Sequence, residues 1–184
     1  LAVHFRNGWQ VLPIDFARID ACYELRIVLE CEAVRWLCSG RGNIGALESM
    51  EEVWAVPALE RISEGNTVAA LDEAFHLCIV EAAGNAEMVR VHRELTDHVR
   101  IVRRLDFTQA VRITATYEEH AIILAALRER NARCCEQQLR AHIETSRCEV
   151  RQITLHRLAQ MHANATLSEQ GEAIPAQATS PAVR

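Results

Sequence analysis

The sequence of 184 residues contains no lysine, and all 20 of its basic residues are arginine. The chain therefore cannot form a lysine Schiff base, and it lacks the lysine that a phosphate-binding P-loop requires. Its 25 acidic residues give a net charge of −5. This mild acidity argues against a nucleic-acid-binding surface on the chain, because binding phosphates needs a concentrated basic face.

Long apolar runs and paired cysteine motifs are missing as well. No apolar run approaches the roughly 20 residues that cross a bilayer, and no signal peptide is visible. The seven cysteines are odd in number and follow no C-x-x-C spacing. Most of them fall within apolar helical stretches, where a free cysteine acts as a small hydrophobe. These absences indicate a reduced, cytoplasmic protein with no membrane segment.

Helical periodicity dominates the sequence, which has 49% hydrophobic residues and only 7 Gly and 4 Pro. A chain of this length and apolar content suits one domain with a sizeable core. Apolar spacing and capping residues predict six helices with short connections, and hence an all-α antiparallel bundle. Pro57 breaks or bends the second helix and leaves a count of seven open. The predicted helices span about 15–38, 44–63, 67–83, 86–105, 110–130 and 131–162.

Local signals define the helix ends and the two termini. Asp15 and Thr67 are the expected N-caps of the first and third helices, and Gly40 is the expected stop of the first. Residues 5–14 predict a short strand after an Asn-Gly turn. The segment from Asn164 to the end mixes small and polar residues without periodicity, and is predicted to be a disordered tail.

Four polar side chains interrupt the apolar faces of three predicted helices. Asp72 and His76 lie four residues apart in the apolar stripe of the third helix, so both point the same way. His120 occupies the middle of the stripe in the fifth helix, and His142 that in the sixth. Burying a carboxylate and three imidazoles is costly unless each finds a partner.

A bound divalent metal is one explanation that satisfies all four residues. If the helices bring their stripes together, Asp72, His76, His120 and His142 would surround the ion. Three imidazole nitrogens and one carboxylate oxygen suit Zn²⁺, Ni²⁺, Mn²⁺ or Fe²⁺. In the alternative explanation each histidine is a satisfied core residue, and Asp72 and His76 form a simple hydrogen-bonded pair. The spacing alone leaves both explanations open.

Arginines on two helices are candidates for binding an anionic ligand. Arg26 lies with Glu30 among the apolar residues of the first helix. The two form either an i,i+4 ion pair or a site in which Arg26 grips a carboxylate with its planar fork. Of Arg100, Arg103 and Arg104, which otherwise fit a solvated face, Arg104 is the candidate. The remaining histidines are interpreted as structural, with a pocket role left open for His98: His92, His98, His156 and His162.

Several segments together resemble a known family of helical ligand-sensing domains. They are Tyr23-Glu-Leu-Arg26 with Leu29-Glu30, Asp72-Glu-Ala-Phe-His76, Ala83-Gly-Asn85, Glu119-His120, Ala125-Ala-Leu-Arg128 and Arg140-Ala-His142. This order resembles the FCD domain, the effector-binding half of FadR-subfamily GntR transcriptional regulators. The likeness covers roughly residues 16–160.

The resemblance implies a dimeric bundle that holds a divalent metal through Asp72, His76, His120 and His142. A small carboxylate or sugar acid would complete the coordination, helped by Arg26. Some family members bind acyl-CoA and lack the metal residues, so the presence of all four favours the metal-dependent branch. A count of six helices favours the VanR-like arrangement over the seven-helix FadR-like one.

The resemblance also suggests a domain organisation. Residues 6–11 are similar to the last strand of the winged-helix wing that precedes such domains. We therefore expect residues 1–14 to be a remnant of the wing and linker, 15–162 the effector-binding and dimerisation domain, and 163–184 the tail. Operator DNA would be bound only through a winged helix-turn-helix domain absent from this sequence, which begins with Leu.

Two other classes of function stay open, although we expect no enzyme. A di-iron bundle enzyme needs two Glu-x-x-His pairs and further carboxylates, whereas the sequence offers only Glu73–His76, with Glu73 turned away. A metallohydrolase needs a general base beside the metal-bound water. Glu118 and Glu119 adjoin His120, but we expect them to point elsewhere. The other class is a structural bundle without metal.

Overall fold

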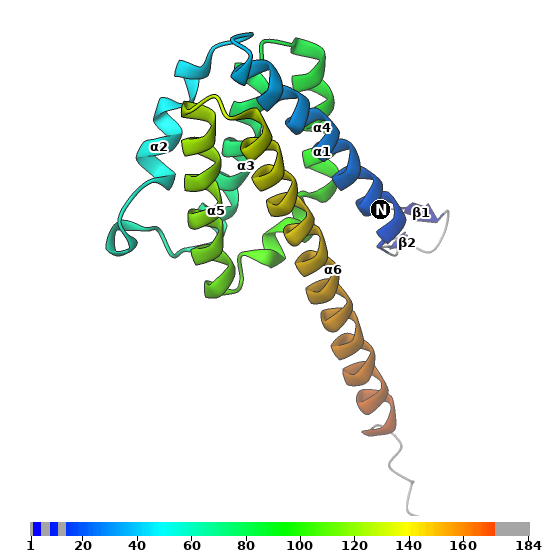
Figure 1. Ribbon diagram of the computed structural model, residues 1–184. Coiled ribbons are helices and arrows are strands. Elements are labelled where there is room, and N and C mark those ends of the chain that lie inside the picture. The colour runs from blue at the N-terminus through cyan, green and yellow to red at the C-terminus, as the bar shows by residue number, and fades with distance from the viewer. Residues whose placement is uncertain (1, 5–7, 11–13, 172–184) are drawn as a thin grey trace, which may run out of the picture.

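The computed structural model describes the protein at residues 2–4, 8–10 and 14–171, and the helical part of it is an antiparallel bundle (Figure 1). This confirms the predicted all-α fold. Two 3₁₀ turns, η1 (Ile44–Leu47) and η2 (Ala58–Glu60), flank the second helix. The six α-helices of the described part are α1 Phe16–Cys38, α2 Glu48–Trp54, α3 Gly65–Ala82, α4 Ala86–Asp106, α5 Ala110–Arg128 and α6 Ala132–Gly171.

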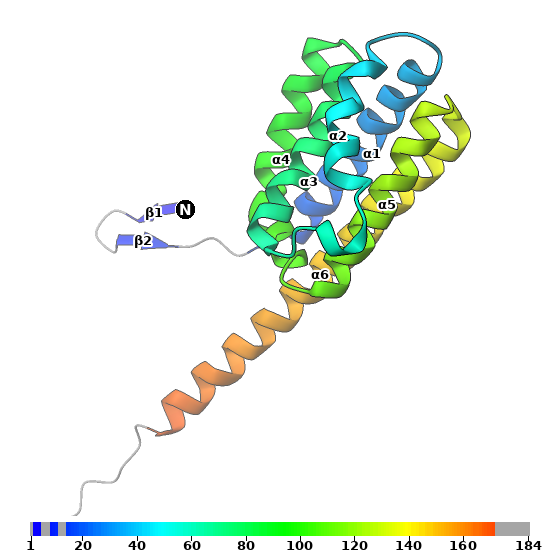
Figure 2. The same cartoon turned by 90° about the vertical axis from the view of Figure 1, so that its left-hand side faces the viewer.

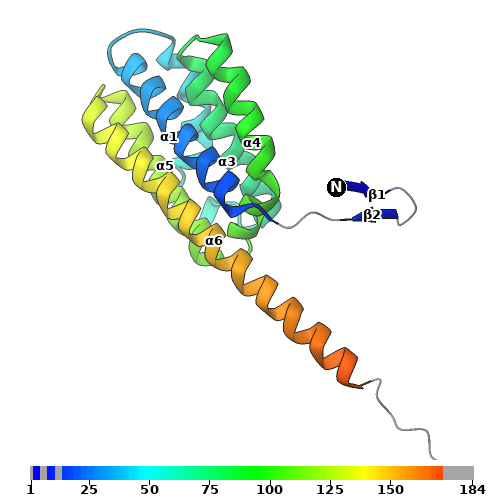
Figure 3. The same cartoon turned by 90° about the vertical axis from the view of Figure 1, so that its right-hand side faces the viewer.

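Helix α1 lies at the centre of the packing. It contacts α4 on one side and α6 on the other, and its inner face meets α3 (Figures 2 and 3). Helix α5 packs on α6 and carries the short α2 on its other side. Val34, Phe75, Ile79, Ile123 and Leu139 are fully buried where these helices meet. The inward faces of α3, α5 and α6 therefore share one core.

The ends of α1 follow the predicted signals. Asp15 is the N-cap, and its carboxylate accepts a hydrogen bond from the backbone N–H of Arg18. The helix ends at Cys38, and Gly40 follows with a φ of +88°. Glycine suits this position, because the left-handed region is costly for residues with a Cβ.

The segment between α1 and α3 is less helical than predicted. Only α2 is an α-helix, and Pro57 separates it from η2. The break expected at Pro57 is confirmed, because proline disfavours the helical conformation of the residue before it and removes a backbone donor.

The N-cap of α3 is Glu64, not Thr67. The Glu64 carboxylate accepts hydrogen bonds from the backbone N–H groups of Asn66 and Thr67, and the helix begins at Gly65. Thr67 is not the cap, because the helix already begins two residues before it and its own N–H is one of the groups that Glu64 binds.

Helix α6 is longer than predicted. It continues to Gly171 and runs well beyond the bundle (Figure 1), so a tail beginning at residue 163 is wrong for 163–171. No proline or glycine occurs between Asn131 and Gly171, and Ala, Leu, Glu and Gln favour helix. Apolar periodicity shows which residues pack against the bundle and not where a helix ends. The periodicity stops near residue 162, so the sequence placed the end of α6 too early. Residues 172–184 lie outside the described residues.

Two three-residue strands, β1 (Ala2–His4) and β2 (Gly8–Gln10), pair antiparallel before the bundle. Strand β2 falls within the predicted strand over 5–14, of which residues 5–7 and 11–13 lie outside the described residues. Among the described residues, no helix has the length and apolar character needed to span a membrane.

Candidate metal centre

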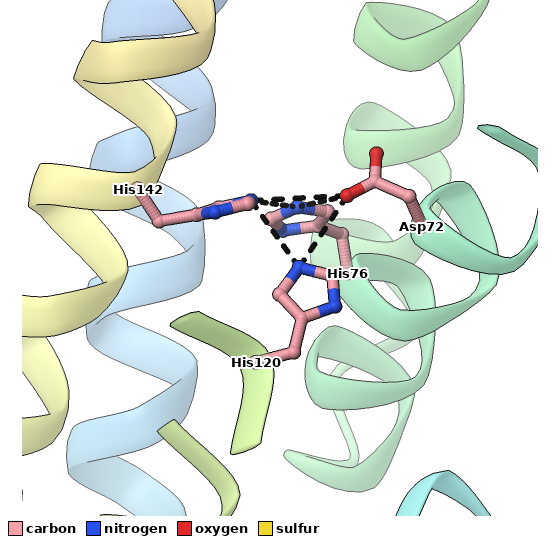
Figure 4. A group of neighbouring side chains, drawn as sticks. All are labelled: Asp72, His76, His120 and His142. Atoms are coloured by element: carbon pink, nitrogen blue, oxygen red, sulfur yellow. Dashed lines mark hydrogen bonds and ion pairs between the residues drawn. The ribbon is translucent and has the colours of Figure 1, made fainter. Parts of the chain in front are cut away.

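Asp72, His76, His120 and His142 meet in the middle of the bundle (Figure 4). Helix α3 contributes the first two, α5 the third and α6 the fourth. One ligand atom from each lies within 4.8 Å of the other three, and all four residues are buried. The residues singled out by their position on apolar stripes therefore lie together.

The distances within this group suit a single ion. The Nε2 atom of His142 lies 3.1 Å from that of His76 and 3.3 Å from that of His120. Asp72 Oδ1 lies 3.4 to 3.8 Å from the three Nε2 atoms. Metal–ligand bonds of about 2.0–2.2 Å place neighbouring ligand atoms of a tetrahedral or octahedral ion roughly 3.0–3.5 Å apart.

Two carboxylates hold the outer nitrogens of two of the histidines. Nδ1 of His76 lies 2.5 Å from Glu30 Oε2, and Nδ1 of His142 lies 2.5 Å from Glu119 Oε2. An ionised carboxylate only accepts hydrogen bonds, so each Nδ1 carries the proton and donates it. Each Nε2 then presents a lone pair toward the centre, in the orientation that such carboxylates give to metal-binding histidines.

The protonation states of the side chains around this cluster favour the binding of a cation. Burial lowers the pKa of His120 to about 3 and that of His142 to about 4, so both imidazoles are neutral at pH 7. Burial alone would raise the pKa of Glu119, but hydrogen bonds from His142 and Arg112 outweigh it and lower the pKa to about 2. His120 and His142 are thus neutral, and the Glu119 carboxylate beside His142 stays ionised.

Asp72 provides the clearest sign of an unfilled bonding position. Its Oδ2 pairs with Nη2 of Arg103, whereas its buried Oδ1 has no hydrogen-bond partner among the described residues. Burial opposes the charge of Asp72, but the Arg103 guanidinium and the neighbouring His120 and His76 hold its pKa well below the usual range. A buried, ionised oxygen facing three imidazole nitrogens is the donor set of a metal site.

The structure treats the two candidate arginines differently. Arg26 is buried beside the centre, and its Nε donates to Glu30 Oε1 at 3.1 Å. Arg104 is exposed and lines a surface hollow with Glu64 and Phe107, so it is not brought to the cluster. Its neighbour Arg103 takes the inward position instead, paired with Asp72.

Three further residues of the site were missed or misjudged in the sequence. Glu119 does not point away as expected, since it contacts His142 across the α5–α6 interface. His92 is buried and its Nε2 lies 2.9 Å from Glu30 Oε1, so it belongs to the same network. Arg112 is buried and donates to Glu119 from one side. By contrast, Glu73 turns away as expected and pairs with Arg100.

Comparison with known proteins identifies the family. The sequence profile of the FCD domain matches residues 21–145, which is more than half of the chain and a range that includes the four candidate ligands. The chain belongs to the FCD domain family. The names of its relatives are those of transcriptional regulators and not of enzymes.

Two curated relatives match this FCD domain over most of its length. An HTH-type transcriptional regulator, YdhC, of Bacillus subtilis (strain 168) is 24% identical over 139 residues, which are 74% of this chain and 62% of the relative. The Nta operon transcriptional regulator of Aminobacter aminovorans is 30% identical over 122 residues, 66% of this chain and 56% of the relative. The chain thus spans less than two thirds of either relative.

A solved structure shares the fold. It is described as the metal-free FCD domain of a transcriptional regulator, TM0439, and superposes with a TM-score of 0.66 at 18% identity. The similarity covers 79% of this chain and 99% of the other. At this identity the likeness concerns the fold alone.

Proposed function

We propose that this FCD domain binds one divalent transition metal and a small organic acid, and so controls DNA binding by a winged helix-turn-helix domain outside this chain. The observation that carries the proposal is the convergence of three Nε2 atoms and a carboxylate oxygen without a hydrogen-bond partner among the described residues on one buried point. Zn²⁺, Ni²⁺, Mn²⁺ and Fe²⁺ all accept such ligands. When bound, the ion would supply positive charge and open positions for a carboxylate.

The charges around the centre favour an anionic partner. Three buried arginines, Arg26, Arg103 and Arg112, face three ionised carboxylates, Glu30, Asp72 and Glu119. Arg112 is also shared with the buried Asp106 and with Glu149. A divalent ion would add two positive charges to this group, and an acid with one or two carboxylates would offset them in a low-dielectric interior.

Two of the arginines also have N–H groups to offer. Nη2 of Arg26 and Nη1 of Arg103 are buried and make no hydrogen bond among the described residues, although Nη2 of Arg26 lies 3.1 Å from Glu30 Oε1 in their ion pair. Burial lowers the pKa of Arg26, and the nearby charge of Arg103 lowers it further. A carboxylate between the two guanidinium groups would accept from both and relieve their repulsion.

Six helices and a complete ligand set support membership of the VanR-like, metal-dependent branch, acting as a cytoplasmic homodimer. Bound acid would change the packing of α1, α4 and α6, and through the dimer the placement of the DNA-binding domains. A ligand shifts such an equilibrium only by its different affinity for the two states, and about 1–3 kcal/mol would change operator affinity roughly 5–150-fold.

The proposal is tested by thermal unfolding of metal-loaded and metal-free protein against hydroxy-, di- and sugar acids, with fatty acyl-CoA as the contrasting class. We expect some of these acids to raise the melting temperature only when metal is present, and Arg26→Ala to abolish the shift. Stabilisation by acyl-CoA alone, or by acids irrespective of metal, would contradict the proposal.

A further inference from the structure

The two carboxylates that orient His76 and His142 differ sharply in their surroundings. Glu30 is completely buried on α1 and receives hydrogen bonds from His76, His92 and Arg26. Each of these donors has at most 1% of its surface exposed. The carboxylate that holds His76 is therefore enclosed by side chains of α1, α3 and α4.

Glu119 lies at the boundary with solvent. Its side chain is 28% exposed, and it receives hydrogen bonds from His142 and Arg112. Arg112 is itself shared with Glu149, whose side chain is 40% exposed and lies 3.1 Å from the arginine Nε. Water can therefore compete for Glu119, whereas it cannot reach Glu30.

Buried groups also hold the other two ligands, although Nδ1 of His120 has no hydrogen-bond partner among the described residues. The ring of His120 stacks on Phe75 with 3.7 Å between ring centroids, and it meets Trp54 edge-on at 4.3 Å. Asp72 is fixed by its pair with Arg103. Of the four ligands, only His142 has its orienting partner in contact with solvent.

We infer that the metal enters and leaves on the α5–α6 side, and that His142 is the ligand that detaches first. Glu119 acts as a positioning residue: it keeps the proton of His142 on Nδ1 and the Nε2 lone pair directed at the ion. Arg112 pairs with Glu119 as well, and its Nη2 lies 3.3 Å from Nδ1 of His142. The inference rests on the proposed metal site.

The test compares Glu119→Gln with Glu118→Gln, a neighbouring glutamate on the same helix whose side chain is 63% exposed. Each protein is loaded with Co²⁺ and mixed with excess EDTA, and the loss of the Co²⁺ absorption gives the release rate. Loss of a carboxylate that orients a metal-binding histidine weakens metal binding roughly 10–100-fold. We expect release from Glu119→Gln to be at least about tenfold faster than from wild type. Glu118→Gln should match wild type, and Glu119→Asp should recover part of the difference.

A second measurement needs no metal. Long-range ¹⁵N NMR of the metal-free protein reports which nitrogen of each histidine carries the proton. We expect His142 to be protonated on Nδ1 in wild type and in Glu118→Gln, and to lose that preference in Glu119→Gln while His76 keeps it.

Equal release rates for the Glu118 and Glu119 variants would overturn the inference, as would an Nε2-protonated His142 in wild type. A wild-type protein that takes up no Co²⁺ would contradict the proposed function instead. In that event the NMR result alone decides whether Glu119 positions His142.

Discussion

Arg103 pairs with only one of the two carboxylate oxygens of Asp72, and the other oxygen faces the three histidines. Asp72 is thus held by a buried cation on one side and left unpartnered on the side where a metal would bind. The pair also explains how the chain keeps an ionised carboxylate in its core without an ion, because the guanidinium compensates the charge.

The pair predicts the effect of Asp72→Asn on the metal-free protein. Removing the negative charge leaves Arg103 charged and buried, and breaking a buried pair in this way costs about 3 kcal/mol of unfolding free energy. Urea denaturation measures the loss. Asp97→Asn is the control, since this exposed partner of Arg100 should contribute less than about 1 kcal/mol. A stable Asp72→Asn protein would show that Arg103 does not depend on Asp72.

The contribution of Asp106 to stability is predicted to fall as the pH rises toward neutrality. Burial raises its pKa from 3.8 to about 7 in the folded protein, with the nearby Glu149 adding to the rise. The native state therefore binds this proton more tightly than the unfolded state does. Its contribution is fully present below about pH 3.8 and is lost as the pH rises through about 7.

Asp106→Asn should remove this pH dependence, because the amide mimics the protonated acid and still accepts a hydrogen bond from Ser146. Urea denaturation of the metal-free proteins at acid and neutral pH gives the comparison. The variant should gain stability relative to wild type between pH 4 and pH 7. A constant difference between the two proteins over that range would contradict the raised pKa.

Substitutions at two glycines distinguish two contributions to the free energy of unfolding: the cost of a left-handed backbone and the cost of a steric clash. Both Gly42 and Gly84 have positive φ, but only at Gly42 would a Cβ meet backbone, 2.3 Å from the carbonyl oxygen of Ala82. Gly84→Ala should cost about 1–2 kcal/mol for the backbone conformation alone. Gly42→Ala should cost roughly 1–3 kcal/mol more, because the loop after α1 would be forced away from α3. Similar melting temperatures for the two variants would show that this approach is not tight.

The four candidate ligands could be found from the sequence because burial shows in a helical pattern. Asp72 and His76 share one face by their spacing, and His120 and His142 each interrupt an apolar stripe. A polar residue at a core position is conspicuous whatever the tertiary structure. The sequence pattern does not show which helices pack together or which residues lie at the same level along the bundle, because both depend on tertiary packing.

Arg104 shows that limit. The buried face of α4 includes His92, Val99 and Arg103. One residue along a helix turns the side chain by about 100°, so Arg104 points away from the face that Arg103 occupies.

Glu119 was misjudged for a related reason. Its position beside His120 places it on a neighbouring face of α5, which is half-buried only because α6 packs there. The contact that gives it a role comes from His142, 23 residues away in the sequence. No local pattern on α5 distinguishes Glu119 from the exposed Glu118.

The central claim is that one metal ion is bound by Asp72, His76, His120 and His142. The most direct measurement is the metal content of protein purified without chelator or nickel resin, for wild type, His120→Ala and His156→Ala, an exposed histidine of α6. We expect about one equivalent of transition metal in wild type and in His156→Ala, and none in His120→Ala. Equal metal content in all three proteins, or no uptake by wild type after addition of Zn²⁺ or Ni²⁺, would contradict the account.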